Sequence, residues 1–92
     1  MISRTIAQFR RAFAELPLEV QHQARRAYRL FKQNPSHPSL RFKPVHPRRP
    51  IYAVRINPGY RAVGILEGDE IIWFWIGSHA DYGRLLSQWR RR

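Results

Sequence analysis

Residues 51–77 constrain the fold most, because they contain three runs of β-forming residues separated by two turns. The stretch reads IYAVRINPGYRAVGILEGDEIIWFWIG, and β-branched or aromatic residues dominate each run. The Asn-Pro-Gly at 57–59 and the Gly-Asp at 68–69 are residue types that tight turns favour. This half of the chain is therefore predicted to form an antiparallel β-meander.

The N-terminal third shows helical spacing instead. Apolar side chains recur about every 3.6 residues between Ile6 and Leu16, and Thr5 and Gln8 have the spacing of a capping box. A first helix is therefore predicted over residues 5–15.

A second helix is predicted from Pro17, which suits the first helical position, to about Asn34. An apolar stripe and a basic face lie on opposite sides of this helix. The stripe contains Val20, Ala24, Ala27, Tyr28 and Phe31, and the basic face contains Arg25, Arg26, Arg29 and Lys32.

Prolines dominate the connection between the helices and the meander. NPSHPS at 34–39 is typical of a loop, and LRFKPVHPRRP at 40–50 alternates apolar and basic residues before prolines interrupt it. We expect a short edge strand followed by a basic loop. Two helices followed by a sheet predict an α+β fold, with residues 1–92 forming a single domain.

Charge indicates the kind of partner. The chain has 17 Lys and Arg residues against six Asp and Glu residues, a formal net charge of +11. The basic residues are spread along the chain, so the charge belongs to the folded surface and favours RNA, DNA or an acidic protein as partner.

The absence of cysteine and of long apolar segments indicates the cellular compartment of the protein. The chain contains no cysteine, which excludes disulfides and thiolate metal sites and fits a reducing cytosol. No segment has the length and apolarity of a signal peptide or of a membrane span. We expect a cytoplasmic protein with no membrane partner, no metal and no cofactor.

Counting across the strands brings two arginines together. A three-residue loop at 57–59 would place Ile56 opposite Tyr60 and Arg55 opposite Arg61, whereas a two-residue Pro-Gly turn would put the arginines on opposite faces. Like charges that face each other are destabilising, so an anion such as phosphate is expected between them. The alternative is that the arginines are solvated or pair with acidic residues at 67 and 69.

The next hairpin extends this prediction. A two-residue loop at 68–69 would place Glu67 opposite Glu70, Ile65 opposite Ile72, Val63 opposite Phe74 and Arg61 opposite Ile76. His79 follows three residues later, so it should emerge beside the two arginines.

The residues that follow the last strand are predicted either to start a helix or to contribute a functional pair, His79 and Tyr82, or to do both. Ser78 and Asp81 have the spacing of a capping box that starts a helix through Leu85 and Leu86. His79 and Tyr82 would then share one helix face and look toward the arginines. The alternative for Tyr82 is an aromatic residue of the core or of an interface.

Both faces of the predicted meander are apolar. One face should pack on the two N-terminal helices, and the other should be covered by the end of the chain or by a partner. Trp73 and Trp75 are more typical of core residues than of a platform for nucleic-acid bases.

Four segments, taken in order, resemble the toxins of the RelE/ParE superfamily over nearly the whole chain. They are LP between the helices, NPSHPSLRFK after the second helix, YAVRINPGYRAVGILEGDEIIWFWIG, and the His and Tyr that follow. The resemblance implies a RelE-like α+β toxin of a type II toxin–antitoxin system, with a short C-terminal helix and a cognate antitoxin as partner.

The resemblance also implies a set of functions. RelE-like members cut messenger RNA in the ribosomal A site, whereas ParE-like members inhibit DNA gyrase. A metal-independent mRNA endonuclease is the leading interpretation, and a gyrase inhibitor or an inactive basic binding module are the alternatives.

Cleavage by attack of a 2′-hydroxyl needs a base, a charge clamp on the phosphate and an acid. The resemblance assigns Arg61 to the phosphate, with Arg55 as a second clamp. It assigns proton transfer to His79, because imidazole exchanges protons near neutral pH. Tyr82 would stack on a base or assist proton transfer.

The second proton-transfer group should come from the segment LRFKPVHP. Lys43 and His46 are the candidates there, and Arg41 and His46 are expected to contact the substrate.

Overall fold

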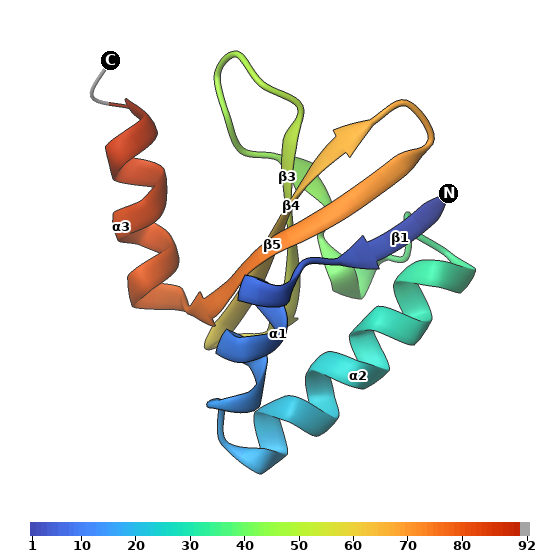
Figure 1. Ribbon diagram of the computed structural model, residues 1–92, viewed down its shortest axis with the longest axis vertical. Coiled ribbons are helices and arrows are strands. Elements are labelled where there is room, and N and C mark those ends of the chain that lie inside the picture. The colour runs from blue at the N-terminus through green and yellow to red at the C-terminus, as the bar shows by residue number, and fades with distance from the viewer. Residues whose placement is uncertain (91–92) are drawn as a thin grey trace.

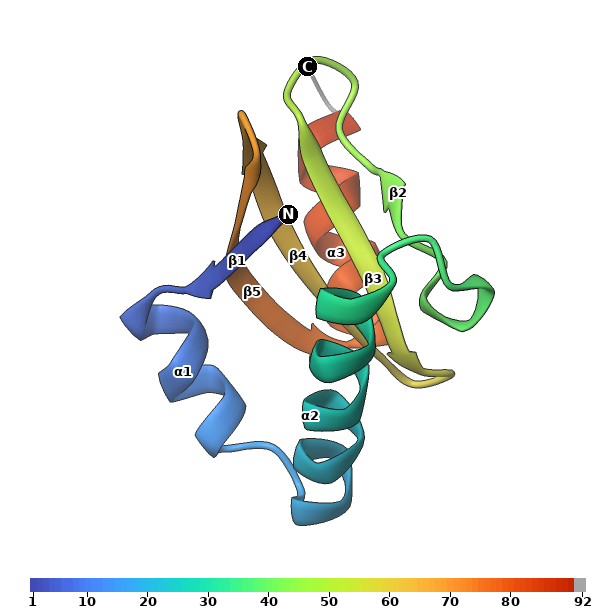
Figure 2. The same ribbon diagram turned by 90° about the vertical axis from the view of Figure 1, so that its right-hand side faces the viewer.

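The computed structural model describes residues 1–90, which form a mixed sheet with helices on both faces (Figures 1 and 2). The strand order in the sheet is β1-β5-β4-β3-β2. The elements are β1 (Ile2–Thr5), α1 (Ala7–Ala14), α2 (Leu18–Gln33), the 3₁₀ turn η1 (Pro38–Leu40), β2 (Lys43–Pro44), β3 (Ile51–Asn57), β4 (Tyr60–Glu67), β5 (Glu70–Ser78) and α3 (His79–Arg90). The predicted α+β class, with two helices packed on a meander and a short C-terminal helix, is confirmed.

Strand β1 was not predicted. It pairs in parallel with β5, with Ile2 opposite Glu70 and Thr5 opposite Trp73. Thr5 therefore lies in a strand and does not cap α1; its hydroxyl accepts a hydrogen bond from Arg10 at 3.1 Å. A four-residue strand whose partner lies at the other end of the chain leaves no local pattern in the sequence.

Helix α2 agrees with its predicted stripe, since Val20, Ala24 and Phe31 are buried. Pro17 is the N-cap residue, so the helix begins one residue later than expected. The predicted edge strand is shorter than expected, because Leu40 is buried in η1 and only residues 43–44 pair with β3.

The β3–β4 hairpin combines the two loop alternatives. Its turn is the two-residue Pro58-Gly59, with Asn57 opposite Tyr60, so the predicted pairing of Ile56 with Tyr60 is wrong. A bulge at residue 56 then restores the register, and Arg55 lies opposite Arg61 as predicted.

A second bulge shifts the β4–β5 pairing. Glu67 lies opposite Glu70 and Ile65 opposite Ile72, as predicted, but Val63 faces Trp75 and Arg61 faces Gly77. The predicted partners, Phe74 and Ile76, are wrong by one residue. The extra residue at 74 allows Phe74 and Trp75 to pack on the same face.

Each face of the sheet has its own core. The face toward α1 and α2 buries residues that include Val54, Ala62, Ile71, Trp73 and Ile76. The other face buries Ile51, Ala53 and Val63, and α3 covers them with the buried Tyr82 and with Leu85, Leu86 and Trp89. The end of the chain, one of the two expected covers, therefore occupies the second face.

Crossing a bilayer requires a length and an apolarity that no helix within residues 1–90 combines.

Candidate functional site

A small basic pocket lies on the α3 side of the sheet. Its volume is about 100 Å³. The pocket is lined by Arg41, Lys43, Arg55, Arg61, His79 and Tyr82, together with Ala53 and Val54. All the predicted site residues except His46 therefore line one cavity, which we call the basic pocket.

Strand pairing explains why residues far apart in the sequence meet here. Lys43 of β2 lies opposite Ala53 of β3, and Arg55 of β3 lies opposite Arg61 of β4. His79 begins α3 at the end of β5, where Arg61 lies opposite Gly77. The pocket thus draws on three neighbouring strands and on the start of the helix that covers them.

Arg61 is held by the β3–β4 turn. Its Nη1 donates hydrogen bonds to the carbonyl oxygens of Asn57 at 2.7 Å and Tyr60 at 3.0 Å. Burial lowers the pKa of Arg61, and the charges of Arg55 and Arg41 lower it further. The charged guanidinium is therefore less stable here than in water, and a bound anion would relieve that cost.

The same turn also holds the start of α3. The backbone N–H of His79 donates to the carbonyl of Gly59 at 2.7 Å. Asn57 Oδ1 accepts from the N–H of Gly59 at 2.7 Å, and Asn57 Nδ2 donates to Gln23 Oε1 of α2. Asn57 therefore connects α2 to the turn that positions Arg61 and His79, a role that the sequence pattern did not indicate.

His79 is exposed at the first position of α3. Its ring centroid lies 6.0 Å from that of Tyr82, so the two side chains lie on the same side of the helix, as predicted. Ser78 Oγ accepts from the N–H of Asp81 at 3.1 Å, which confirms half of the capping box. The carboxylate of Asp81 pairs with Arg84, which differs from the expected contact with the N-terminal turn.

Tyr82 belongs both to the pocket and to the core. It is 6% exposed, its ring lies 6.4 Å from that of Trp75, and the Arg61 guanidinium lies 6.0 Å from its ring centroid. Burial raises the pKa of Tyr82, although the charge of Arg61 opposes the rise. The phenol therefore keeps its proton at neutral pH and can donate a hydrogen bond, but it cannot act as a base.

Arg41 carries backbone strain. Its φ is 47°, in the left-handed region, and within residues 1–90 no other non-glycine residue has a positive φ. It follows η1 directly and lines the pocket from that side. A side chain retained where glycine would be less strained is a feature often found at functional sites.

His46 does not line the pocket. Its Nδ1 accepts from the N–H groups of Arg48 and Arg49, both at 3.0 Å, and its ring lies 5.1 Å from that of Trp89. These interactions hold the ring in the basic loop, outside the pocket, and contact of His46 with the substrate stays a prediction.

The pocket has no carboxylate in its lining. Ion pairs among residues 1–90 join Arg4 to Glu70 and Arg84 to Asp81, so neither Arg55 nor Arg61 pairs with Glu67 or Asp69. No group of three His, Cys, Asp or Glu side chains in the described part of the chain could hold a metal ion. The cations of the pocket are therefore available to an anion.

Comparison with protein families places the chain among known toxin domains. The model of the ParE-like toxin domain matches residues 18–84, which cover most of the chain and every residue that lines the basic pocket. No relative was found by sequence among curated proteins.

Solved structures show the same fold at low sequence identity. RelE in the RelB–RelE antitoxin–toxin complex from Methanococcus jannaschii has a TM-score of 0.71 at 15% identity, covering 88% of this chain and 95% of its own. YafQ from E. coli strain BL21(DE3) has a TM-score of 0.68 at 13% identity, covering 87% and 94%. The YoeB/ParE toxin from Agrobacterium tumefaciens has a TM-score of 0.67 at 13% identity, covering 86% and 99%.

Proposed function

Because the chain belongs to the ParE-like toxin domain family, within the RelE/ParE superfamily of toxin–antitoxin toxins, we propose that it cleaves messenger RNA on the ribosome without a metal ion. The observation that carries the proposal is the basic pocket, which brings two facing arginines together with His79, Tyr82 and Lys43. A cognate antitoxin is the protein partner, and action on ribosomes requires a cytoplasmic location.

The proposed reaction is attack of an RNA 2′-hydroxyl on the adjacent phosphate. The new bond joins the 2′ oxygen to phosphorus and the bond to the 5′ oxygen breaks, which leaves a 2′,3′-cyclic phosphate and a 5′-hydroxyl. One proton must leave the 2′-hydroxyl and one must reach the 5′ oxygen. The negative charge that builds on the phosphate must be stabilised in between.

Each of these requirements has a residue in the pocket. Arg61 and Arg55 hold the non-bridging phosphate oxygens, with Arg41 as an additional cation of the pocket lining. In this proposal His79 carries one of the two proton transfers, and Lys43 carries the other. Tyr82 keeps its proton, so it donates a hydrogen bond to the phosphate or to the leaving oxygen.

A second candidate is a DNA gyrase inhibitor that does not cleave RNA. The observation that favours it is the family model itself, since the matching domain is the ParE-like one. In this case the basic pocket would bind an anionic surface without using His79 for proton transfer.

One experiment separates the two candidates. Purified protein is added to ribosomes translating a defined messenger RNA, and the 3′ ends of the fragments are mapped and tested for a cyclic phosphate. We expect cleavage that falls on the order of 10²-fold for His79→Ala and changes little for His22→Ala, an exposed histidine of α2. Intact RNA together with inhibition of gyrase supercoiling would favour the second candidate.

A further inference from the structure

The basic loop between β2 and β3 carries arginines that the proposed reaction does not use. The loop reads VHPRRP, and both Arg48 and Arg49 are exposed. Figures 1 and 2 place this loop and the C-terminal end of α3 at the same end of the molecule, where Arg90 is also exposed. We call these three arginines, together with His46 and Trp89, the loop patch.

Hydrogen bonds fix the backbone of the loop. His46 Nδ1 accepts from the backbone N–H groups of both loop arginines at 3.0 Å. The carbonyl of Arg49 accepts from Ile51 at 2.7 Å, and that of Pro50 accepts from β4 at 2.9 Å. Proline also occupies every third position from 44 to 50, which restricts φ. The two guanidinium groups therefore extend from a preorganised backbone, which lowers the entropic cost of binding a ligand.

Two aromatic rings lie between the loop and α3. The ring centroids of His46 and Trp89 are 5.1 Å apart, and neither side chain is buried. Trp89 packs against the core that α3 covers, as does Val45 of the loop, so the patch lies on the same face of the sheet as the basic pocket. Accessible aromatic rings beside arginines are a usual platform for unpaired nucleic-acid bases.

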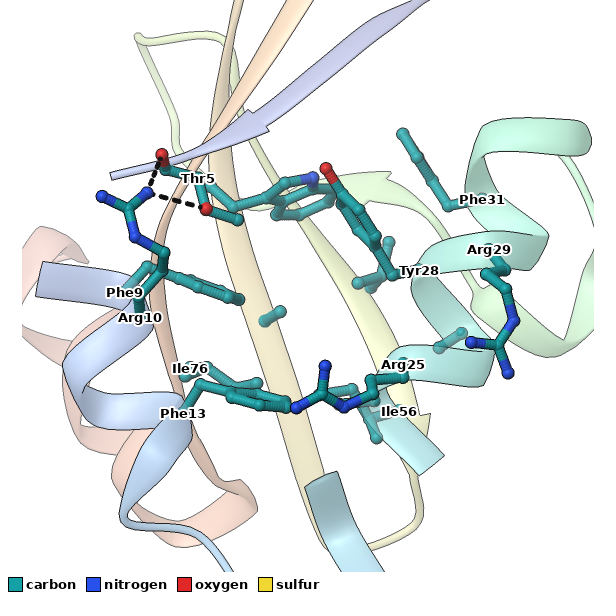
Figure 3. A pocket seen from close by; sticks show the side chains of 15 residues that line it. Thr5, Phe9, Arg10, Phe13, Arg25, Tyr28, Arg29, Phe31, Ile56 and Ile76 are labelled. Carbon is teal, nitrogen blue, oxygen red and sulfur yellow. Dashed lines mark hydrogen bonds between the residues drawn. The ribbon is translucent and has the colours of Figure 1, made fainter. Parts of the chain in front are cut away.

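The arginines of the opposite face have different surroundings. There α1 and α2 leave a cavity of about 450 Å³ with mainly aromatic and aliphatic walls, which we call the helix cavity (Figure 3). Arg25 lies 4.9 Å from the ring centroid of Phe13, and Arg10 donates to the carbonyl of Thr5 at 2.7 Å. Within residues 1–90 the arginines of the loop patch have neither a carboxylate partner nor such a ring contact.

Helix α3 connects the loop patch to the basic pocket. His79 begins the helix at the pocket, and Trp89 follows ten residues later, a distance of about 15 Å along the axis. Nucleic-acid strands advance about 3.4 Å per nucleotide when their bases stack, so this distance corresponds to roughly four nucleotides. Burial raises the pKa of Tyr82 in the pocket, and the charges of Arg61 and Arg90 oppose the rise, so the charge of Arg90 acts on the pocket as well.

We propose that the loop patch is a second binding site for the RNA strand, in which Trp89 stacks on an unpaired base and the three arginines hold the neighbouring phosphates. The base lies roughly four nucleotides from the cut. His46 is a positioning residue, because it fixes the arginine N–H groups and contacts the Trp89 ring. The proposal rests on the proposed function, since the strand held here is the one that the basic pocket would cleave.

Binding of short RNAs to the full chain tests the site without requiring cleavage. Oligonucleotides with 2′-O-methyl groups lack the attacking hydroxyl, so the protein can bind them but not cut them. Two lengths are compared, about three and about eight nucleotides, of which only the longer spans both sites. Affinities are measured by fluorescence anisotropy at several salt concentrations.

The longer RNA should bind roughly tenfold more tightly than the shorter one, because it gains a stacked base and further phosphate contacts. Arg48→Ala combined with Arg49→Ala should remove most of this gain. It should also lower the slope of log K against log salt for the longer RNA by about 1.4, since each phosphate contact on a single strand contributes about 0.7. The shorter RNA should change by less than about twofold.

Two further variants separate charge from stacking. Arg26→Ala combined with Arg29→Ala removes two exposed charges from α2 on the opposite face, and should leave the advantage of the longer RNA unchanged. Trp89→Leu should weaken binding of the longer RNA several-fold without changing its salt slope, because the lost contact is uncharged. Thermal unfolding of each variant checks that it is folded.

Three outcomes would overturn the proposal. They are equal affinity for the two RNA lengths, equal effects of the two double variants, and displacement of the longer RNA by a polyglutamate peptide of the same charge at equal concentration, which would assign the patch to an acidic protein. Cleavage on ribosomes without the length effect leaves the proposed function standing and removes the second site. The length effect without cleavage supports the RNA site and contradicts the nuclease.

Discussion

Two hollows on opposite faces of one sheet both carry arginines, but in different settings. In the basic pocket, Arg61 is half-buried, faces Arg55 across the strands, and is held by backbone carbonyls. In the helix cavity, the arginines are exposed and surround a wall of aromatic and aliphatic side chains.

The difference shows that the setting of an arginine decides what it can do. A guanidinium that burial and like charges have made less stable gains much from an anion, and in the pocket it lies beside His79 and Tyr82. A solvated guanidinium gains roughly 0–1 kcal/mol from an exposed ion pair. The exposed arginines of the helix cavity therefore gain little from a single anion.

The strongest test of this contrast removes one arginine from each hollow. Arg61→Ala should reduce the rate of RNA cleavage on ribosomes by on the order of 10³-fold, because the charge clamp on the phosphate is lost. Arg29→Ala should change the rate by less than about twofold. Equal effects of the two substitutions in single-turnover assays would erase the functional distinction between the hollows.

Asn57 connects helix α2, on one face of the sheet, to the basic pocket on the other face. It contacts Gln23 of α2 and fixes the β3–β4 turn that holds Arg61 and His79. Asn57→Ala should lower the cleavage rate constant about tenfold with little change in KM, since the groups stay but lose their alignment. Gln23→Ala removes only the contact with α2 and should have a smaller effect. A change in KM alone would contradict the positioning role.

Arg41 allows stability and activity to be separated. Arg41→Gly should raise the free energy of unfolding by up to about 1 kcal/mol, because glycine adopts the left-handed conformation without strain. The same change should lower cleavage several-fold by removing a cation from the pocket. Arg41→Ala is the matched control in urea unfolding, since it should lose the same activity without the gain in stability.

The smallest expected effect concerns Tyr82 at alkaline pH. Burial raises the pKa of Tyr82 in the folded protein, so as pH rises above about 10 the unfolded chain loses this proton first. The folded state then binds more protons, and stability falls with pH through this window. Tyr82→Phe should show a shallower loss of stability there than the parent, and parallel curves would contradict the assignment.

Much of the fold could be predicted because its signals are local. The stripe of α2 and the turns at 58–59 and 68–69 each depend on residues close together in the chain. The pairing of Arg55 with Arg61 came from a count that assumed a three-residue loop, and it holds because the bulge at residue 56 compensates for the two-residue turn. His79 and Tyr82 followed from this pair, whereas Arg41 and Lys43 were expected from the resemblance to the toxin family.

The parts of the fold that the sequence did not predict depend on strand partners far away in the chain or on single inserted residues. β1 lacks a local pattern because its partner lies about seventy residues away in the chain, as in the pairing of Ile2 with Glu70. The bulges at 56 and 74 change the register by one residue, which no alternation of side chains reveals. His46, expected at the substrate from the resemblance of its segment to the toxin family, lies outside the basic pocket, because contacts within its loop and with Trp89 hold its ring there.

The sequence by itself determined two apolar sheet faces, a strongly basic surface and the facing pair Arg55 and Arg61, because these depend on local periodicity and composition. Only the tertiary structure decided that α3 covers one face, that the β3–β4 turn holds both Arg61 and His79, and that α1 and α2 leave a cavity between them. These features depend on how elements pack in three dimensions, and packing is set by contacts between segments far apart in the chain.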